Sequence, residues 1–167
     1  VNSFAGDDEF FFDDTGTTFT INSGLGNDSF QIGQIYGATP VPALAGDKIE
    51  GNDTTRGFLS LGTSHEVTIN GGDNSDQFSV YSNKAELFLR GDDGDDNFEL
   101  RAFITSGDLN VGSGKGADTI VYNINAKVHI DGGEGNDKVT VIGTEAGDSF
   151  LINDDGIYGA GINADMI

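Results

Sequence analysis

The sequence predicts an all-β fold, a right-handed parallel β-roll or β-helix solenoid with a period of about 20 residues. Three observations predict it. One pattern of short alternating stretches around a Gly/Asp-rich turn recurs along the chain. Gly, Asp and Asn supply 61 of the 167 residues, so the chain turns very often. No stretch shows the 3.6-residue apolar period of a helix. We expect about seven to eight coils, right-handed because parallel crossovers usually are.

The composition predicts one domain, a repeat solenoid over residues 1–167. With 36% hydrophobic residues and 12 Phe the chain can bury a core. Its formal charge of −20 argues against nucleic acid as a partner and against docking on anionic lipid. No apolar run approaches the roughly 20 residues that span a bilayer, so we expect no membrane insertion. Thiol chemistry is excluded by the absence of Cys, and the two histidines, His65 and His129, are expected on the surface.

Five segments align without a gap, and they define the repeat unit. They are residues 19–32, 67–80, 87–100, 109–122 and 128–141. Each reads apolar-x-apolar, a six-residue turn ending in Asp, then x-apolar-x-apolar. The closing Asp residues are 48, 20, 22 and 19 residues apart, and degenerate copies close at Asp8 and Asp148. A weaker match at Asp47 predicts a further coil in the long interval, with an inserted irregular stretch at about 33–57.

Stacking one coil per repeat predicts two apolar ladders inside the solenoid, because alternate residues of a strand share a face. The first ladder reads Phe10, Phe30, Phe78, Phe98, Ile120 and Val139, and the second reads Phe12, Ile32, Val80, Leu100, Tyr122 and Val141. An antiparallel sandwich with hairpin turns is the alternative. It gives no reason for the same Asp at the same offset in every turn.

The Asp turns predict a bound cation. Stacked coils would bring the carboxylates within a few ångströms of one another, and like charges so placed disfavour the compact state. Calcium accepts six to eight carboxylate and carbonyl oxygens in tolerant geometry, whereas soft metals have no ligands here. The alternative for each Asp is a plain Asx-turn, in which the carboxylate accepts a backbone N–H.

The turns resemble the haemolysin-type calcium-binding repeats of RTX proteins, whose nonapeptide is G-G-x-G-x-D-x-U-x with U apolar. Residues 132–140 (GGEGNDKVT) match it completely, while Asp92 and Asn74 replace turn glycines in two other copies. Both residue types tolerate a left-handed backbone. The resemblance implies several Ca²⁺ ions between successive turns, held by the side chain of the sixth residue and by turn carbonyls. It nominates as ligands Asp28, Asp76, Asp96, Asp118 and Asp137, then Asp8 and Asp148 from the degenerate copies, with Asp93 and Asp95 beside them in the most acidic turn.

This chain departs from an RTX roll, which repeats every nine residues with a metal turn on both edges. Here the period is about 20 and calcium is expected along one edge, except near Asp148, where both edges look competent. The chain also resembles the β-helical stretches of large bacterial surface proteins.

The resulting functional expectation is a calcium-stabilised structural module of an extracellular bacterial protein, such as an adhesin stalk, surface-layer or filament component. We expect no enzyme and no catalytic residue, because the eight Lys and Arg are scattered and no G-x-S-x-G elbow occurs. Expected partners are calcium, neighbouring coils or like subunits end to end, and a cell-surface glycan. The alternative is a carbohydrate-binding or carbohydrate-active β-helix of the lyase or epimerase type.

Overall fold

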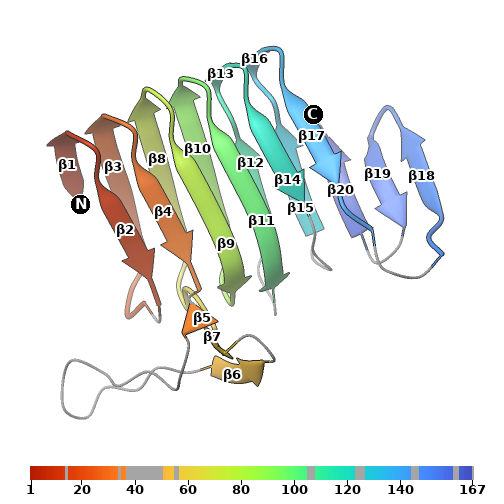
Figure 1. Cartoon of the computed structure of the whole chain (residues 1–167), viewed down its shortest axis with the longest axis horizontal. Helices are drawn as coiled ribbons and strands as arrows, with labels where there is room; N and C mark the ends of the chain where they lie inside the picture. The colour runs from red at the N-terminus through yellow and green to blue at the C-terminus, as the bar shows by residue number, and fades with distance from the viewer. Residues whose placement is uncertain are drawn as a thin grey trace.

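The computed structural model shows a β-solenoid with no helix among the residues that it describes. These are residues 1–13, 15–33, 35–36, 51–54, 57–104, 108–122, 127–143, 147–159 and 162–166. Two parallel sheets face each other, and each coil contributes one strand to each of them (Figure 1). The prediction of an all-β parallel solenoid with a period of about 20 residues is confirmed, and the antiparallel sandwich is wrong.

The larger sheet, called here the long sheet, carries the first strand of every coil. Its strands along the solenoid are β1 (Asn2–Ala5), β3 (Phe19–Leu25), β8 (Val67–Asp73), β10 (Leu87–Asp93), β12 (Leu109–Gly112) and β15 (Lys127–Asp131), with two-residue strands β13 (Lys115–Gly116) and β16 (Glu134–Gly135) beside them. The second sheet, called the short sheet, consists of β2 (Glu9–Phe12), β4 (Ser29–Ile32), β9 (Gln77–Asn83), β11 (Asn97–Ile104), β14 (Thr119–Tyr122) and β17 (Lys138–Val141).

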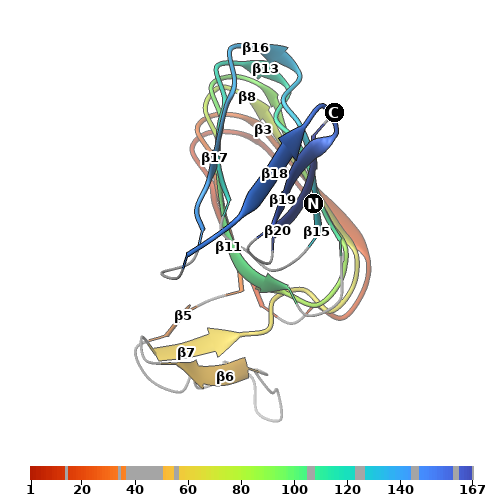
Figure 2. The ribbon, with the colours of Figure 1, turned by 90° about the vertical axis from the view of Figure 1, so that its right-hand side faces the viewer.

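The chain runs up the long sheet at the back, crosses at the top edge and descends the short sheet at the front while advancing along the axis (Figure 1). This path is right-handed, as the usual crossover rule predicts. The solenoid completes about five turns, fewer than the seven to eight expected. The end-on view in Figure 2 shows the two sheets enclosing one narrow core.

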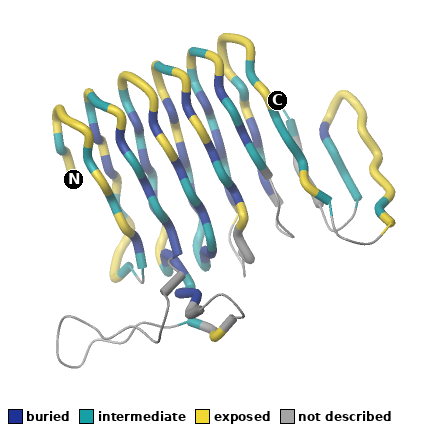
Figure 3. Tube along the Cα trace, viewed as in Figure 1, coloured by how far each residue is buried: buried dark blue, intermediate teal, exposed yellow. Residues whose placement is uncertain are grey.

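Both predicted ladders form in register. The first pairs Phe10, Phe30, Phe78, Phe98, Ile120 and Val139 in succession, and the second pairs Phe12, Ile32, Val80, Leu100, Tyr122 and Val141. Four of the phenylalanines stack ring on ring, with centroid distances of 5.2, 4.8 and 4.5 Å along the row from Phe10 to Phe98. Buried residues alternate with less buried ones along the strands in the middle of the solenoid, such as β8 and β10 (Figure 3). The opposite wall of the core comes from the long sheet, with Ile69, Leu87, Leu89, Leu109 and Val128 among its buried residues.

No coil stacks between β3 and β8, so the expectation of a further coil based on Asp47 is wrong. Strand β3 pairs directly with β8, and β4 with β9, which leaves no place for a coil between them. Asp47 itself lies outside the described residues. The interval instead contributes a three-stranded antiparallel sheet of β5 (Ile35–Tyr36), β7 (Gly57–Ser60) and β6 (Gly51–Thr54), which projects below the solenoid (Figure 1).

After β17 the chain leaves the repeating path. Strands β18 (Phe150–Asn153), β19 (Gly156–Gly159) and β20 (Ile162–Met166) form an antiparallel meander. Its last strand, β20, pairs in parallel with β15 and so extends the long sheet. In this region local hairpin pairing therefore takes the place of the repeating coil path.

Candidate functional site

The candidate site is the edge at which every coil crosses from the long sheet to the short sheet. We call it the Asp edge, and it comprises the turns that close at Asp8, Asp28, Asp76, Asp96, Asp118 and Asp137. In each turn the second and fourth residues have positive φ, which explains the recurrent glycines. Asn74 (φ 85°) and Asp92 (φ 70°) take this left-handed backbone where Gly is replaced, as the sequence predicted. Phe4 (φ 82°) does so in the first turn, and its side chain is exposed.

The Asp side chains form a ladder of hydrogen bonds along the axis. In every step, the main-chain N–H of one Asp donates to Oδ1 of the equivalent Asp in the next coil. The N–O distances are 2.7 Å from Asp8 to Asp28, 2.7 Å from Asp28 to Asp76, 2.8 Å from Asp76 to Asp96, 2.8 Å from Asp96 to Asp118 and 3.1 Å from Asp118 to Asp137. The ladder fixes one oxygen of each carboxylate.

The second oxygen of four consecutive carboxylates has no hydrogen-bond partner. These are the Oδ2 atoms of Asp28, Asp76, Asp96 and Asp118, whose residues are only 1%, 2%, 2% and 1% exposed. Burying a polar oxygen without a partner is unfavourable, by about 1–3 kcal/mol for a neutral group and by more for a charged one. The row therefore requires a ligand or a proton that supplies the missing interaction.

Glycines leave room beside two of these oxygens. A Cβ placed on Gly91 would collide with Asp96 Oδ2 and with the carbonyl oxygen of Ser113 in the next coil. A Cβ on Gly71 would likewise collide with Asp76 Oδ2 and would lie 2.9 Å from the carbonyl oxygen of Gly91. The unpartnered oxygens of Asp76 and Asp96 thus each share a small space with a main-chain carbonyl oxygen of the following coil.

Ser replaces Gly at the same place in three other turns, and in the first of them the Ser3 hydroxyl donates to the carbonyl oxygen of Ser23 at 2.8 Å. The Ser23 hydroxyl donates to the carbonyl oxygen of Gly71, and the Ser113 hydroxyl donates to that of Gly132 at 2.8 Å. In those turns a hydroxyl therefore satisfies the neighbouring carbonyl. The carboxylate Oδ2 atoms of Asp28 and Asp118 are still left without a partner.

Electrostatics disfavour four ionised carboxylates in this row. Equivalent groups of neighbouring coils lie one strand spacing apart, and two charges about 4.8 Å apart repel by roughly 3 kcal/mol at an effective dielectric of about 20. Desolvation by burial raises the pKa of Asp76 from 3.8 to about 7, although the N–H of Asp28 partly opposes the rise. Desolvation likewise raises the pKa of Asp96 to about 6, with the charge of Asp118 adding to it. The folded row therefore favours either protons or a cation.

The donor chemistry of the Asp edge fits a hard cation in part. Unpartnered carboxylate oxygens facing carbonyl oxygens are the ligands that calcium prefers. Within the described residues, however, no three His, Cys, Asp or Glu side chains gather around one point as a metal cluster. A bound ion would therefore combine one carboxylate per turn with main-chain carbonyls such as those of Gly91 and Ser113.

The remaining predicted ligands differ in their surroundings. Asp137 is half-buried and closes the ladder, and Asp8 begins it. Asp93 is exposed and pairs with Lys115 at 2.6 Å, and exposed Asp95 accepts the N–H of Ala117 at 2.9 Å. Asp148 lies after β17, beyond the last Asp-edge turn, where a Cβ on Gly143 would meet its Oδ2. The structure thus unites the five principal candidates and Asp8 in one ladder.

Two further side-chain ladders escaped the sequence analysis. In the turns, Oδ1 of Asp7 accepts the N–H of Asn27, whose own Oδ1 accepts that of Ser75. On the outer face of the long sheet, hydrogen bonds link the side-chain amides of Asn2, Asn22 and Asn70 in a row. At each step Nδ2 of one Asn donates to Oδ1 of the Asn in the preceding coil at 2.7 Å. The fifth turn position carries Asp, Asn or Ser in four of the aligned repeats, which is a signal that could have revealed the first ladder.

Comparison with protein-family models, with curated proteins and with solved structures yields no match for this chain. Across the described ranges, no helix is long and apolar enough to cross a membrane.

Proposed function

We propose that the chain is a non-enzymatic structural solenoid whose Asp edge binds several Ca²⁺ ions. The observation that carries this proposal is the row of four buried carboxylate oxygens without a partner, in a chain of formal charge −20. A divalent cation between coils would neutralise the repulsion and supply the missing interactions. Magnesium suits the edge less well, because it requires near-octahedral geometry and retains its waters.

The proposed mechanism is linkage between binding and folding. Only stacked coils bring the carboxylates and carbonyls together, so calcium binds the folded edge and stabilises it by mass action. The module would be loose where calcium is scarce and stiff where it is millimolar. For this reason we place it outside the cell, in a bacterial adhesin stalk, surface layer or filament.

End-to-end contacts with further coils or with like subunits belong to the same proposal. Strands β2 and β17 are the terminal strands of the short sheet, and β1 is the terminal strand of the long sheet at the same end as β2. Their outward edges offer unpaired main-chain groups to another coil. Val1, Phe4 and Phe11 at that end are exposed hydrophobic residues that such a contact would cover.

Isothermal titration calorimetry of chelator-treated protein tests the calcium proposal. We expect more than one Ca²⁺ per chain, no comparable heat from Mg²⁺, and a lower stoichiometry in Asp96→Asn. Asp154→Asn, a change at an exposed position of the β18–β19 turn, is the control and should bind as the wild type does. Absence of calcium binding in the folded protein would refute the proposal.

A further inference from the structure

The outer face of the long sheet contains a hollow of about 220 Å³ over strands β10, β12 and β15. Two rows of outward side chains line it. The strand register places Phe88, Asn110 and His129 in one row, and Arg90, Gly112 and Asp131 in the next. The hollow lies on a lateral face of the solenoid, so it is distinct from the row of Asp carboxylates at the Asp edge.

Gly112 creates the hollow. It lies between Arg90 and Asp131 in the row, and a Cβ added to it would have no neighbour within 4 Å. Its backbone is not left-handed, so neither conformation nor packing requires glycine at this position. The missing side chain leaves open space on the sheet surface between Arg90 and Asp131.

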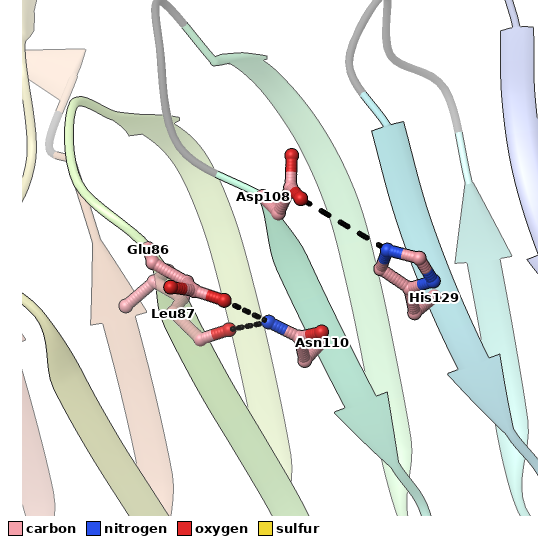
Figure 4. Close-up of polar contacts among 5 residues, drawn as sticks. All are labelled: Glu86, Leu87, Asp108, Asn110 and His129. Atoms are coloured by element: carbon pink, nitrogen blue, oxygen red, sulfur yellow. Dashed lines mark hydrogen bonds and ion pairs between the residues drawn. The ribbon is translucent and has the colours of Figure 1, made fainter.

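Polar groups around the hollow are held by the fold. Nδ2 of Asn110 donates to Glu86 Oε1 at 3.1 Å and to the Leu87 carbonyl at 3.3 Å, which leaves its Oδ1 to accept (Figure 4). In the same view, His129 Nε2 lies 4.0 Å from Asp108 Oδ2.

The second row supplies one cation and one anion. The guanidinium of Arg90 is exposed and donates through one nitrogen to Asn70 Oδ1 at 3.3 Å, so its other N–H groups remain as donors. Asp131 is exposed, and its Oδ1 accepts the N–H of Gly133 at 3.0 Å. The rim therefore offers donors and acceptors together, with the charge of Arg90 opposed by that of Asp131.

We propose that this hollow binds a neutral saccharide, with one pyranose ring seated over Gly112. A sugar ring presents hydroxyls that both donate and accept, which matches Arg90, Asn110 and Asp131. The half-buried ring of Phe88 offers apolar surface to the C–H face of the sugar. A phosphate or carboxylate ligand is disfavoured, because the chain carries a formal charge of −20 and the local charges already balance.

The test is a ¹⁵N–¹H NMR titration of the full chain with cellobiose, maltose and N,N′-diacetylchitobiose, and with digalacturonate as the anionic probe. We expect one of the neutral disaccharides to shift the amide signals of Asn110, Gly112 and His129. Gly112→Leu fills the hollow without meeting a neighbour and should weaken that binding at least tenfold. Gly16→Leu is the matched control, because a Cβ at Gly16 also meets nothing within 4 Å, and it should leave the affinity unchanged. Arg90→Gln, a change at an exposed side chain, should weaken binding severalfold.

The proposal is overturned if no neutral disaccharide shifts these signals at 20 mM, or if digalacturonate alone does so. It is also overturned if Gly112→Leu binds as tightly as the wild type while keeping the wild-type spectrum elsewhere. None of these results bears on calcium binding at the Asp edge.

Discussion

Replacing Asp76 by Asn isolates the energetic effect of one buried charge in the ladder. Asn keeps the size of the side chain and an oxygen that can accept the N–H of Asp28. In the wild type this N–H donates to Asp76 Oδ1 at 2.7 Å. It removes the negative charge, and its Nδ2 would face the carbonyl oxygen of Gly91, which shares the space beside Asp76 Oδ2. Without a cation, the variant should therefore be more stable than the wild type wherever Asp76 would be ionised.

The magnitude follows from the pKa of Asp76, which burial raises from 3.8 to about 7. An acid with a raised pKa makes the folded state hold more protons than the unfolded state between these values. Stability is therefore lost as the pH rises from about 4 to 7, and the loss reaches about 4 kcal/mol at pH 8 if nothing replaces the proton. Asp76→Asn should recover much of this at pH 8 in chelator and little at pH 4.

Urea unfolding followed by far-UV circular dichroism measures the effect at both pH values, in chelator and in 5 mM calcium. In calcium the wild type should be the more stable of the two proteins, because the variant has lost a calcium ligand and is stabilised less by the ion. Asp154→Asn is the control for the loss of an exposed charge and should change stability by less than about 0.5 kcal/mol in every condition. Equal destabilisation of Asp76→Asn at pH 4 and pH 8 in chelator would show that the charge of Asp76 is not what destabilises the folded wild type.

Three further predictions concern the stack, the strained turn and pH. Phe78→Ala removes a fully buried ring between two stacked neighbours and should lower the free energy of unfolding by about 4 kcal/mol. Phe10→Ala, at the half-buried end of the row, should lower it by distinctly less. Chemical denaturation measures both losses, and equal losses would contradict a stabilising role of the stack. Phe4→Gly should stabilise the protein by about 1 kcal/mol in the same assay, because it relieves a left-handed φ of 82° at an exposed residue, and destabilisation would show that the ring makes a needed contact. In chelator the melting temperature should fall between pH 4 and 7, as Asp76 and Asp96 lose their protons, and calcium should flatten that dependence; a pH-independent melt in chelator would count against a strained carboxylate row.

The core of the fold was predictable because aligned repeats show which residues pair between neighbouring strands. Aligning the Asp turns places Phe30, Phe78 and Phe98 in one column without any pairing calculation, and the strand pairing confirms that column. The positive φ of Asn74 and Asp92 was likewise implied by the glycines at the same positions of other turns. Periodicity transfers information from strong copies to weak ones.

Prediction failed where the repeat is broken. Asp47 and a nearby apolar residue suggested a further coil, but β3 pairs directly with β8 and so excludes a coil between them. The alternating residues after Asp148 are compatible with either another coil or a local hairpin, and they form the antiparallel meander of β18 to β20. Short-range pattern cannot distinguish these outcomes, because the pairing partner lies outside the pattern.

The site was predictable in position but not in geometry. The sequence placed Asp28, Asp76 and Asp96 on one edge. It could not show that Oδ1 of each accepts a main-chain N–H of the preceding coil while Oδ2 is buried without a hydrogen-bond partner. That division of the carboxylate depends on the direction of the N–H groups in a stacked turn. The outer hollow at Gly112 was equally hidden, since it arises from side chains of three different coils.

Thermal melting of chelator-treated protein at pH 8, followed by far-UV circular dichroism with and without calcium, tests most directly whether a cation completes the Asp edge. We expect a cooperative β-sheet melt whose midpoint rises by at least 10 °C in 5 mM calcium and by far less in 5 mM magnesium. The same melting temperature in chelator, calcium and magnesium would contradict calcium binding at the Asp edge, and the Asp turns would then be hydrogen-bonded corners whose buried carboxyls keep their protons.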